Sequence, residues 1–462
     1  MSRTVLLCCA VVAALAHPCL ARQANTVSET LIRLNLRAAP APKPVLRYRL
    51  LPELKEMNPG NPIQNYMKCM MEQKKFFFDE EAFQNREKLL AMPLEELPAQ
   101  KLREDGYALS QADRAARLDN PDWQVLLKLR AEGIQLLLPE VQQFRAVARA
   151  LQVRFRAEIA QCRFDDAIRT AKTMFAISRH LGEHPTLIGN VVGIAIASMT
   201  ISHLDEMLEQ PGCPNLYWAL TTLPSPLIPL DKGMDGERVI MSWMFRDLDE
   251  MVPMSTDQLQ KCVADKETLL KLVDRRPSEP SVRKWLDGRI KDAAMVSAAR
   301  HRLVEYGLPE ERASKFPAEQ VILLDEKREL EIRFDDDAKT KSFPFWQAEA
   351  LTSSIKLKKP PALFADLLVP ITINVRRAQA RVDQRIALLR HIEALRLHAE
   401  DHNGTLPTKL ADVCVPLPVD PFTGKPFRYE LAGNTAHLRG TPPAGQEKIP
   451  AYNIHYELTI QQ

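Results

Sequence analysis

The sequence predicts a mainly α-helical fold: an irregular multi-helix body, a short N-terminal β pair, and a small C-terminal α+β module in which a long helix precedes an antiparallel meander. Three observations predict it. Hydrophobic residues make up 45% of the 462-residue chain and charged residues 26%, as in globular proteins with a substantial core. Apolar residues recur at helical spacing almost throughout residues 61–360. Alternating apolar and polar residues, which are typical of strands, occur towards the two ends.

Composition and charge exclude several classes of protein. A wholly disordered chain, a collagen-like fibre and a polytopic membrane protein are all incompatible with this balance of apolar and charged residues. The 62 Lys and Arg residues are matched by 59 Asp and Glu residues, a formal net charge of +3, so the charge does not indicate nucleic-acid binding. Proline (34 residues) outnumbers glycine (16 residues), so the chain has many firm breaks and few flexible ones.

The first 21 residues predict a secretory signal peptide. A short basic start that ends at Arg3 precedes an apolar run over residues 4–16. This run is too short to cross a bilayer, which takes about 20 apolar residues. Cys19 and Ala21 place small residues at −3 and −1 of a cleavage site, so we expect a mature chain that begins at or near Arg22. We therefore expect export to a periplasm or the extracellular space, with no transmembrane segment after cleavage.

Three alternatives to this interpretation exist. Cleavage after Ala16 would leave a slightly longer mature chain. Lipid attachment at Cys19 is disfavoured, because Pro18 occupies a position where a small residue such as glycine or alanine is required. An uncleaved, buried N-terminal helix is the third, and the basic start with its short apolar run argues against it.

The cysteines encode neither a disulfide scaffold nor a zinc ribbon. Cleavage would leave an odd number of widely spaced cysteines with no C-x-x-C pair: Cys69, Cys162, Cys213, Cys262 and Cys414. At most two disulfides could form, and all five side chains are also compatible with buried thiols. We expect Cys162 to be unbridged and packed beside Phe164 as a small apolar residue.

Segments with different patterns divide the mature chain into three parts. Residues 22–60 contain two alternating stretches, 31–37 (LIRLNLR) and 45–51 (VLRYRLL), which predict two short strands around a Pro/Ala linker. The helical body covers residues 61–360; Pro62 opens its first helix, and Ser255 with Gln258 forms a capping box. The third part covers residues 361–462.

Two helical stretches of the body allow a functional and a structural interpretation. Residues 161–167 resemble the tight turn of a tetratricopeptide hairpin with Ala167 at the close-packing position, but no repeat follows. Residues 187–201 are apolar nearly all round, which would also suit a membrane helix. The stretch is short, contains Asn190, and runs directly into charged residues, so a central buried helix is favoured.

One motif could support catalysis. His180, Glu183 and His184 match H-x-x-E-H, the inverted zinc-hydrolase signature, in which two histidines bind zinc and the glutamate acts as general base. This chemistry needs both imidazoles on one helical face and a third ligand from further along the chain. Gly182 weakens the helix between the histidines, and Pro185 disfavours the α conformation at His184. We therefore expect a helix that ends near Gly182, a new helix that starts at Pro185, and separated imidazoles without zinc.

The C-terminal part begins with a long predicted helix over about residues 370–402. Three histidines fall on one side of it: His391, His398 and His402. A metal-binding or pH-sensing role is conceivable, but a stripe beside the apolar face, near a helix C-terminus that favours histidine, explains them better. Asn403-Gly404 supplies the cap, and the alternating residues further on predict three antiparallel strands.

Two resemblances to known families follow from longer matches. The run DHNGTLPTKLADV followed by VDPFTGKPFRYEL resembles the globular end of type II secretion pseudopilins over residues 386–440. The apolar polymerisation helix, the prepilin cleavage motif and the carboxylates of a calcium site are missing, so neither fibre formation nor calcium binding is implied.

Over its full length the chain resembles a family of uncharacterised predicted secreted proteins of planctomycete type, through VLRYRLLPE, EGIQLLLPEVQQ, FDDAIRTAKTMFAISRHLGEHPTLIG and PNLYWALTTLPSPLI. This resemblance implies export and a helical body and transfers no catalytic residue.

The sequence leaves two main functional hypotheses. The first is a non-enzymatic exported binding or scaffold protein of the cell envelope, with protein partners, no cofactor and no nucleic acid; an envelope structural component shares the same features. The alternative is a zinc-dependent hydrolase in which Glu183 is the base and His180 and His184 bind the metal. The backbone argument from Gly182 and Pro185 favours the first.

Overall fold

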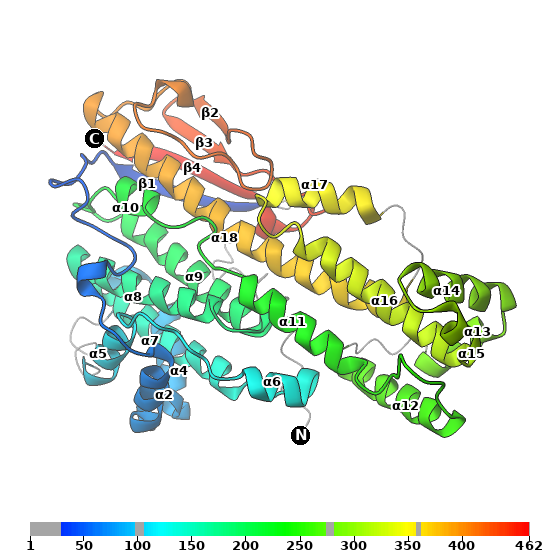
Figure 1. Cartoon of the computed structure of the whole chain (residues 1–462). Coiled ribbons are helices and arrows are strands. Elements are labelled where there is room, and N and C mark those ends of the chain that lie inside the picture. The colour runs from blue at the N-terminus through cyan, green and yellow to red at the C-terminus, as the bar shows by residue number, and fades with distance from the viewer. Residues whose placement is uncertain (1–28, 98–105, 274–280, 357–361, 462) are drawn as a thin grey trace. The chain divides into compact units, whose positions relative to one another are not determined.

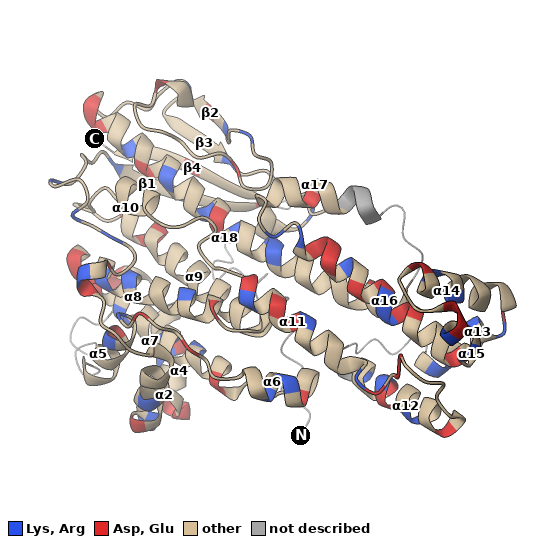
Figure 2. Ribbon diagram, in the orientation of Figure 1, with Lys and Arg blue, Asp and Glu red and all other residues tan. Residues whose placement is uncertain are grey.

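The computed structural model describes residues 29–97, 106–273, 281–356 and 362–461 (Figure 1). The predicted signal peptide at residues 1–21 and the expected start at Arg22 lie outside these residues. Within the described residues the chain forms 17 α-helices and one four-stranded sheet, which confirms the mainly α-helical fold. Figure 2 shows acidic and basic residues interspersed along the long helix α16 (Ala318–Ala338), in keeping with the balanced charge of the sequence.

The chain divides into two compact units, each built from non-contiguous segments. Of the described residues, unit 1 contains Gln124–Leu137 and Met234–Asn374, and unit 2 contains 29–123, Leu138–Gly233 and 375–461. The predicted limits at 60/61 and 360/361 are therefore not the limits of these units. The boundary at residue 374 falls inside α18 (Leu363–Asp401), so one helix contributes to both units.

Unit 2 is centred on three long helices, α7, α8 and α9. Its helices before α18 are α2 (Pro62–Glu72), α3 (Lys74–Phe78), α4 (Glu80–Ala91), α5 (Gly106–Ala115), α7 (Pro139–Ala160), α8 (Phe164–Gly182), α9 (Leu187–Leu208) and α10 (Tyr217–Thr221). Pro62 opens α2 as predicted, with the Asn61 side chain accepting from the Ile63 amide. The predicted hairpin is formed by α7 and α8, and Ala167 is fully buried where they approach. Cys162 lies in the turn with a φ of 54° and is free but exposed, so its predicted packing is wrong.

Helix α9 is the central buried helix that the sequence predicts, and it extends beyond residue 201 to Leu208. Among the described residues it is the one helix long and apolar enough to span a membrane, and 78% of its most apolar window is buried inside the structure. Its neighbours are α7 and α8. Glycines allow the close approach: a Cβ on Gly193 would lie 2.6 Å from the Ser178 carbonyl oxygen of α8.

The sheet of unit 2 joins the two ends of the described chain. Its order is β1 (Thr30–Arg37), β4 (Ile454–Gln461), β3 (Thr435–Arg439) and β2 (Arg428–Ala432). β2, β3 and β4 form the antiparallel meander predicted for the tail, and β1 pairs with β4 in parallel. The C-terminal half of α18 lies along one sheet face (Figure 1), where Arg396 donates to the Arg37 carbonyl oxygen at 2.9 Å.

The predicted partner of β1, residues 45–51, is not a strand, so the expected N-terminal β pair is wrong. The backbone turns there, with the Arg47 amide donating to the Pro44 carbonyl oxygen at 2.9 Å. Alternation predicted a half-buried strand, but β1 finds its hydrogen-bond partners in β4, from the other end of the sequence. The segment instead contacts α8, because Arg47 and the Tyr48 hydroxyl both bind the Asp165 carboxylate.

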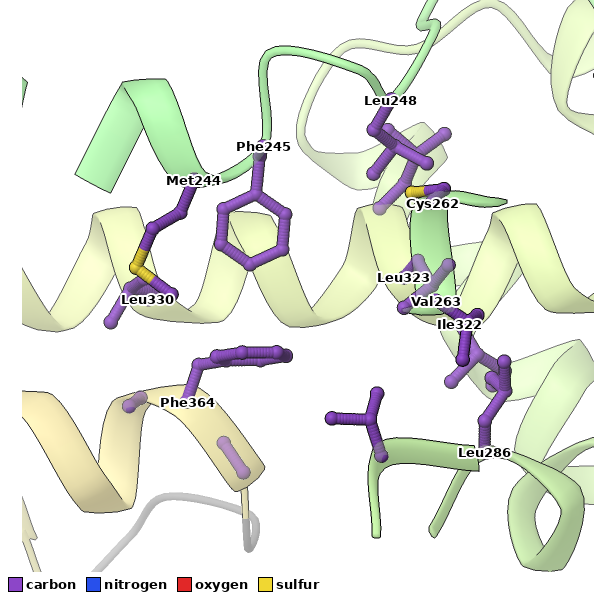
Figure 3. Close-up of a cluster of buried hydrophobic side chains, with 14 of the residues drawn as sticks. Met244, Phe245, Leu248, Cys262, Val263, Leu286, Ile322, Leu323, Leu330 and Phe364 are labelled. Atoms are coloured by element: carbon purple, nitrogen blue, oxygen red, sulfur yellow. The ribbon is translucent and has the colours of Figure 1, made fainter. Parts of the chain in front are cut away.

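Unit 1 has its own apolar core. Its helices before α18 are α6 (Leu126–Glu132), α11 (Asp231–Met244, which starts at the end of unit 2), α12 (Thr256–Val273), α13 (Val282–Ile290), α14 (Ala293–Glu305), α15 (Glu310–Lys315), α16 and α17 (Phe345–Lys356). Figure 3 shows Phe245 and Phe364 facing one another in this core, with Leu323 and Leu330 of α16. The predicted capping box at the start of α12 is confirmed, since Ser255 and Gln258 exchange backbone–side-chain hydrogen bonds. The inserted segment 124–137 is fixed by Trp243, whose indole nitrogen donates to the Ala131 carbonyl oxygen at 2.9 Å.

Candidate functional site

The H-x-x-E-H motif lies where α8 ends and α9 begins, inside unit 2. As Gly182 and Pro185 predict, α8 ends at Gly182. The next helix starts at Leu187 rather than at Pro185, because the Thr186 side chain caps it by accepting from the Gly189 amide. Glu183 and His184 therefore lie in the connection, while His180 is still in the last turn of α8.

His180 is a buried side chain with a structural partner. Its Nδ1 lies 3.2 Å from the hydroxyl oxygen of Tyr66 on α2. Its backbone carbonyl oxygen accepts a 2.9 Å hydrogen bond from the indole nitrogen of Trp123. Burial, reinforced by the nearby Arg179 guanidinium, lowers the pKa of His180 to about 4, so the ring is neutral at physiological pH.

His184 is completely buried in the same region. Its Nδ1 lies 2.9 Å from the Thr186 hydroxyl oxygen, and its ring packs edge-on against Trp123 with a centroid distance of 4.5 Å. Nε2 has no hydrogen-bond partner in the described part of the chain. Burial lowers the pKa of His184 to about 3. A Cβ on Gly189 would lie 2.4 Å from the His184 Cβ, so this glycine makes room for the ring.

Glu183 points to a different partner from the two histidines. Its Oε2 forms a 2.9 Å ion pair with Nζ of Lys232. Among the described residues, none of the three motif side chains belongs to a group of three or more His, Cys, Asp or Glu side chains close enough to hold a metal. The motif is therefore assembled with packing partners around each histidine and an ion pair at the glutamate.

Asn190 fixes the connection between the two helices. Its side-chain amide nitrogen lies 3.3 Å, 2.8 Å and 3.3 Å from the carbonyl oxygens of Leu181, Gly182 and His184, and it donates to them. Two of these carbonyls belong to the last turn of α8, which has no further helical turn to accept from. Asn190 therefore caps α8 from within α9.

The histidine stripe predicted on the C-terminal helix divides into one core residue and one stacked pair. His391 is 1% exposed, its ring packs edge-on against Phe427 at 4.8 Å, and its Nδ1 is 2.8 Å from the Ala387 carbonyl oxygen. The rings of His398 and His402 stack at 3.8 Å near the helix end. The cap forms as predicted, with positive φ at Asn403 and Gly404 and the Gly404 amide donating to the Ala399 carbonyl oxygen.

A third histidine group, on the sheet, was not predicted from the sequence. His437 of β3 and His455 and Glu457 of β4 bring their ligand atoms within 4.8 Å of one another. Nδ1 of His437 is 3.0 Å from Nε2 of His455 and 3.9 Å from Oε1 of Glu457. The signal in the sequence is the H-x-E spacing in YNIHYELTI, which puts two ligands on one face of a strand. Whether His437 lies beside these two ligands depends on the register between β3 and β4, which cannot be read from the sequence.

Comparison with known proteins adds no identification: no family model matches the chain, and no curated protein or solved structure is similar to it. The resemblances to pseudopilins and to predicted secreted proteins of planctomycete type therefore stay predictions from the sequence.

Proposed function

We propose that the protein is a non-enzymatic, exported binding or scaffold protein of the cell envelope. The observation that carries the proposal is that the side chains of the H-x-x-E-H motif are engaged in buried packing contacts and an ion pair. His180 and His184 are buried, each with its Nδ1 beside a hydroxyl group, and Glu183 is paired with Lys232.

The contacts of the motif argue against the zinc-hydrolase alternative. A hydrolytic zinc site keeps one position open to water and substrate and uses a free carboxylate as general base. The ring of His184 is completely buried beside Trp123, where substrate has no access. The Glu183 carboxylate, which would have to act as the base, is instead paired with the ammonium group of Lys232 at 2.9 Å. A structural role accounts for all three residues.

Exposed apolar side chains on unit 1 support the binding part of the proposal. Leu126 and Leu127 of the short helix α6 are 53% and 80% exposed, and Leu137 is 58% exposed. Adjacent apolar side chains that remain in water, as Leu126 and Leu127 do, favour contact with another protein. The envelope protein that binds them is the partner class we propose.

Photocrosslinking in the native envelope tests this proposal. The full chain would carry p-benzoylphenylalanine in place of Leu127, and a matched control would carry it in place of Leu54, a single leucine that is 91% exposed on unit 2. We expect a discrete crosslinked protein from position 127 and none from position 54. Identical crosslinks from both positions, or none from either, would contradict the proposal.

Metal analysis tests the hydrolase alternative directly. If His180 and His184 held a catalytic zinc, His180→Ala would lose the metal, while Glu183→Ala would keep it and lose hydrolysis. We expect neither change to alter any hydrolytic activity or the zinc content of the purified protein. Stoichiometric zinc that disappears in His180→Ala and persists in Glu183→Ala would refute a scaffold function.

A further inference from the structure

We propose that His437, His455 and Glu457 form a binding site for a divalent transition-metal ion, for which Zn²⁺ is the probe. The site goes beyond a scaffold function and uses none of the H-x-x-E-H residues. Two imidazole nitrogens and one carboxylate oxygen are the donor set of many zinc sites, and imidazole favours zinc, copper and nickel over calcium or magnesium.

Strand register brings the three side chains together. His437 of β3 lies directly opposite Glu457 of β4 in the antiparallel pair, so both point to the same face of the sheet. His455 precedes Glu457 by two positions and shares that face. The residues that alternate with them, including Leu438, Tyr456 and Leu458, are fully buried on the other face. The ligand set is therefore fixed by two rigid strands and does not depend on a loop.

Two of the separations between the ligand atoms come close to those of a tetrahedral zinc site. With Zn–N and Zn–O bonds of about 2.0–2.2 Å, neighbouring ligand atoms lie about 3.3–3.6 Å apart. The two ring nitrogens are 3.0 Å apart, and Nδ1 of His437 is 3.9 Å from the Glu457 oxygen. Shifts of a few tenths of an ångström would bring these two separations to the metal geometry, and all three ligand atoms already lie within 4.8 Å of one another. At 3.0 Å one ring donates a hydrogen bond to the other, and an ion bound between the two nitrogens would take the place of that hydrogen.

Neighbouring groups orient the ligands as in established metal sites. Nδ1 of His455 lies 3.3 Å from Oε1 of Glu29, just before β1, which leaves Nε2 directed at His437. A carboxylate behind a ligating histidine fixes the ring and strengthens it as a donor. Arg33 of β1 holds the Oε2 oxygen of Glu457 at 2.7 Å and leaves Oε1 to face His437.

The accessibility of the site suits reversible binding. His455 is 4% exposed by its side chain, whereas His437 and Glu457 are 20% and 24% exposed, so one side of the site is open to solvent. Glu430 of β2 lies opposite His437 on its other side and is exposed. Paired residues of this kind have Cβ atoms about 5 Å apart, so Glu430 or a water molecule can complete four-coordination.

Titration of the metal-free full chain with Zn²⁺ by calorimetry tests the site. We expect one ion per chain, with affinity at least about tenfold lower in His437→Ala and in Glu457→Gln. His301→Ala is the matched control, because His301 is a histidine on α14 with a 75% exposed side chain. That variant should bind zinc as the unmodified protein does. Glu29→Gln should weaken binding about tenfold without changing the stoichiometry.

Cobalt substitution and a folding check make the outcome decisive. Co²⁺ in a four-coordinate site of nitrogen and oxygen ligands absorbs strongly in the visible range, and we expect this band in the unmodified protein and in His301→Ala but not in His437→Ala. Circular dichroism without metal should be the same for all variants. The absence of zinc binding by the unmodified protein, or equal binding by His437→Ala, would overturn the proposal. Crosslinking from position 127 is measured separately. The metal site and the binding function can therefore each fail without affecting the result for the other.

Discussion

Single residues at the α8–α9 connection separate what the sequence could predict about the H-x-x-E-H motif from what it could not. The helix break could be predicted from Gly182 and Pro185, because each acts on the backbone beside it. The partners of His180 and His184 could not, since Tyr66 and Trp123 come from more than 50 residues away in the sequence. Local rules therefore predicted the backbone, while the chemistry of the side chains was decided by tertiary contacts.

Asn190 allows a test of this connection at the scale of one side chain. Asn190→Ala removes the amide that caps three carbonyl groups and leaves them buried without that donor. We expect a loss of about 1–3 kcal/mol in the free energy of unfolding, measured by urea titration. Asn85→Ala, the same change on an exposed face of α4, should stay within about 0.5 kcal/mol. Equal effects of the two changes would show that Asn190 does not cap α8.

Most helices and the C-terminal meander follow from local signals, whereas the pairing of β1 does not. Pro62, the Ser255–Gln258 box and the Asn403-Gly404 cap each mark a helix end that the structure has. The alternation in 45–51 is as regular as that in β1, yet only β1 becomes a strand. A strand needs a partner, and the partner of β1 is more than 400 residues away in sequence. His437, His455 and Glu457 come together through the β3–β4 pairing of the predicted meander, and they were not predicted as a group because the sequence alone does not give the register of these two strands.

The crossing of α8 and α9 provides a prediction at the scale of helices. Gly193→Ala places a Cβ 2.6 Å from the Ser178 carbonyl oxygen and 3.1 Å from the Leu181 Cβ, so the helices must move apart. Because overpacking of a well-packed core costs about 1–3 kcal/mol, we expect a destabilisation of that size in thermal unfolding. Gly288→Ala in α13 is the control, since its Cβ would meet nothing within 4 Å. Alanine is the better helix former, so this variant should match or exceed the stability of the unmodified protein. A neutral Gly193→Ala would refute the close crossing.

At the scale of the whole molecule, each unit buries a titratable group whose pKa is far from its usual value. In unit 2, burial lowers the pKa of His391 to about 4, with the Ala387 carbonyl opposing and Arg390 reinforcing the shift. In unit 1, burial raises the pKa of Glu326 to about 7, although its carboxylate accepts a 2.6 Å hydrogen bond from the Phe364 amide at the start of α18. The two shifts have opposite consequences for stability, because one group resists gaining a proton and the other resists losing one.

These opposite shifts predict opposite pH dependences for two glutamine variants. Between about pH 6.5 and 4 the unfolded chain binds a proton at His391 that the folded chain does not, so this residue costs stability as the pH falls. Between about pH 4.5 and 7 the folded chain keeps a proton on Glu326 that the unfolded chain has lost, so this residue costs stability as the pH rises. Relative to the unmodified protein, His391→Gln should therefore gain stability towards pH 4, and Glu326→Gln should gain it towards pH 7.

Each change in stability is on the order of 3 kcal/mol across its pH window, because one pKa unit corresponds to about 1.4 kcal/mol. Unfolding free energies from urea titrations over this pH range would measure both, and differences that do not change with pH, or change in the same direction, would contradict the burial of these two groups.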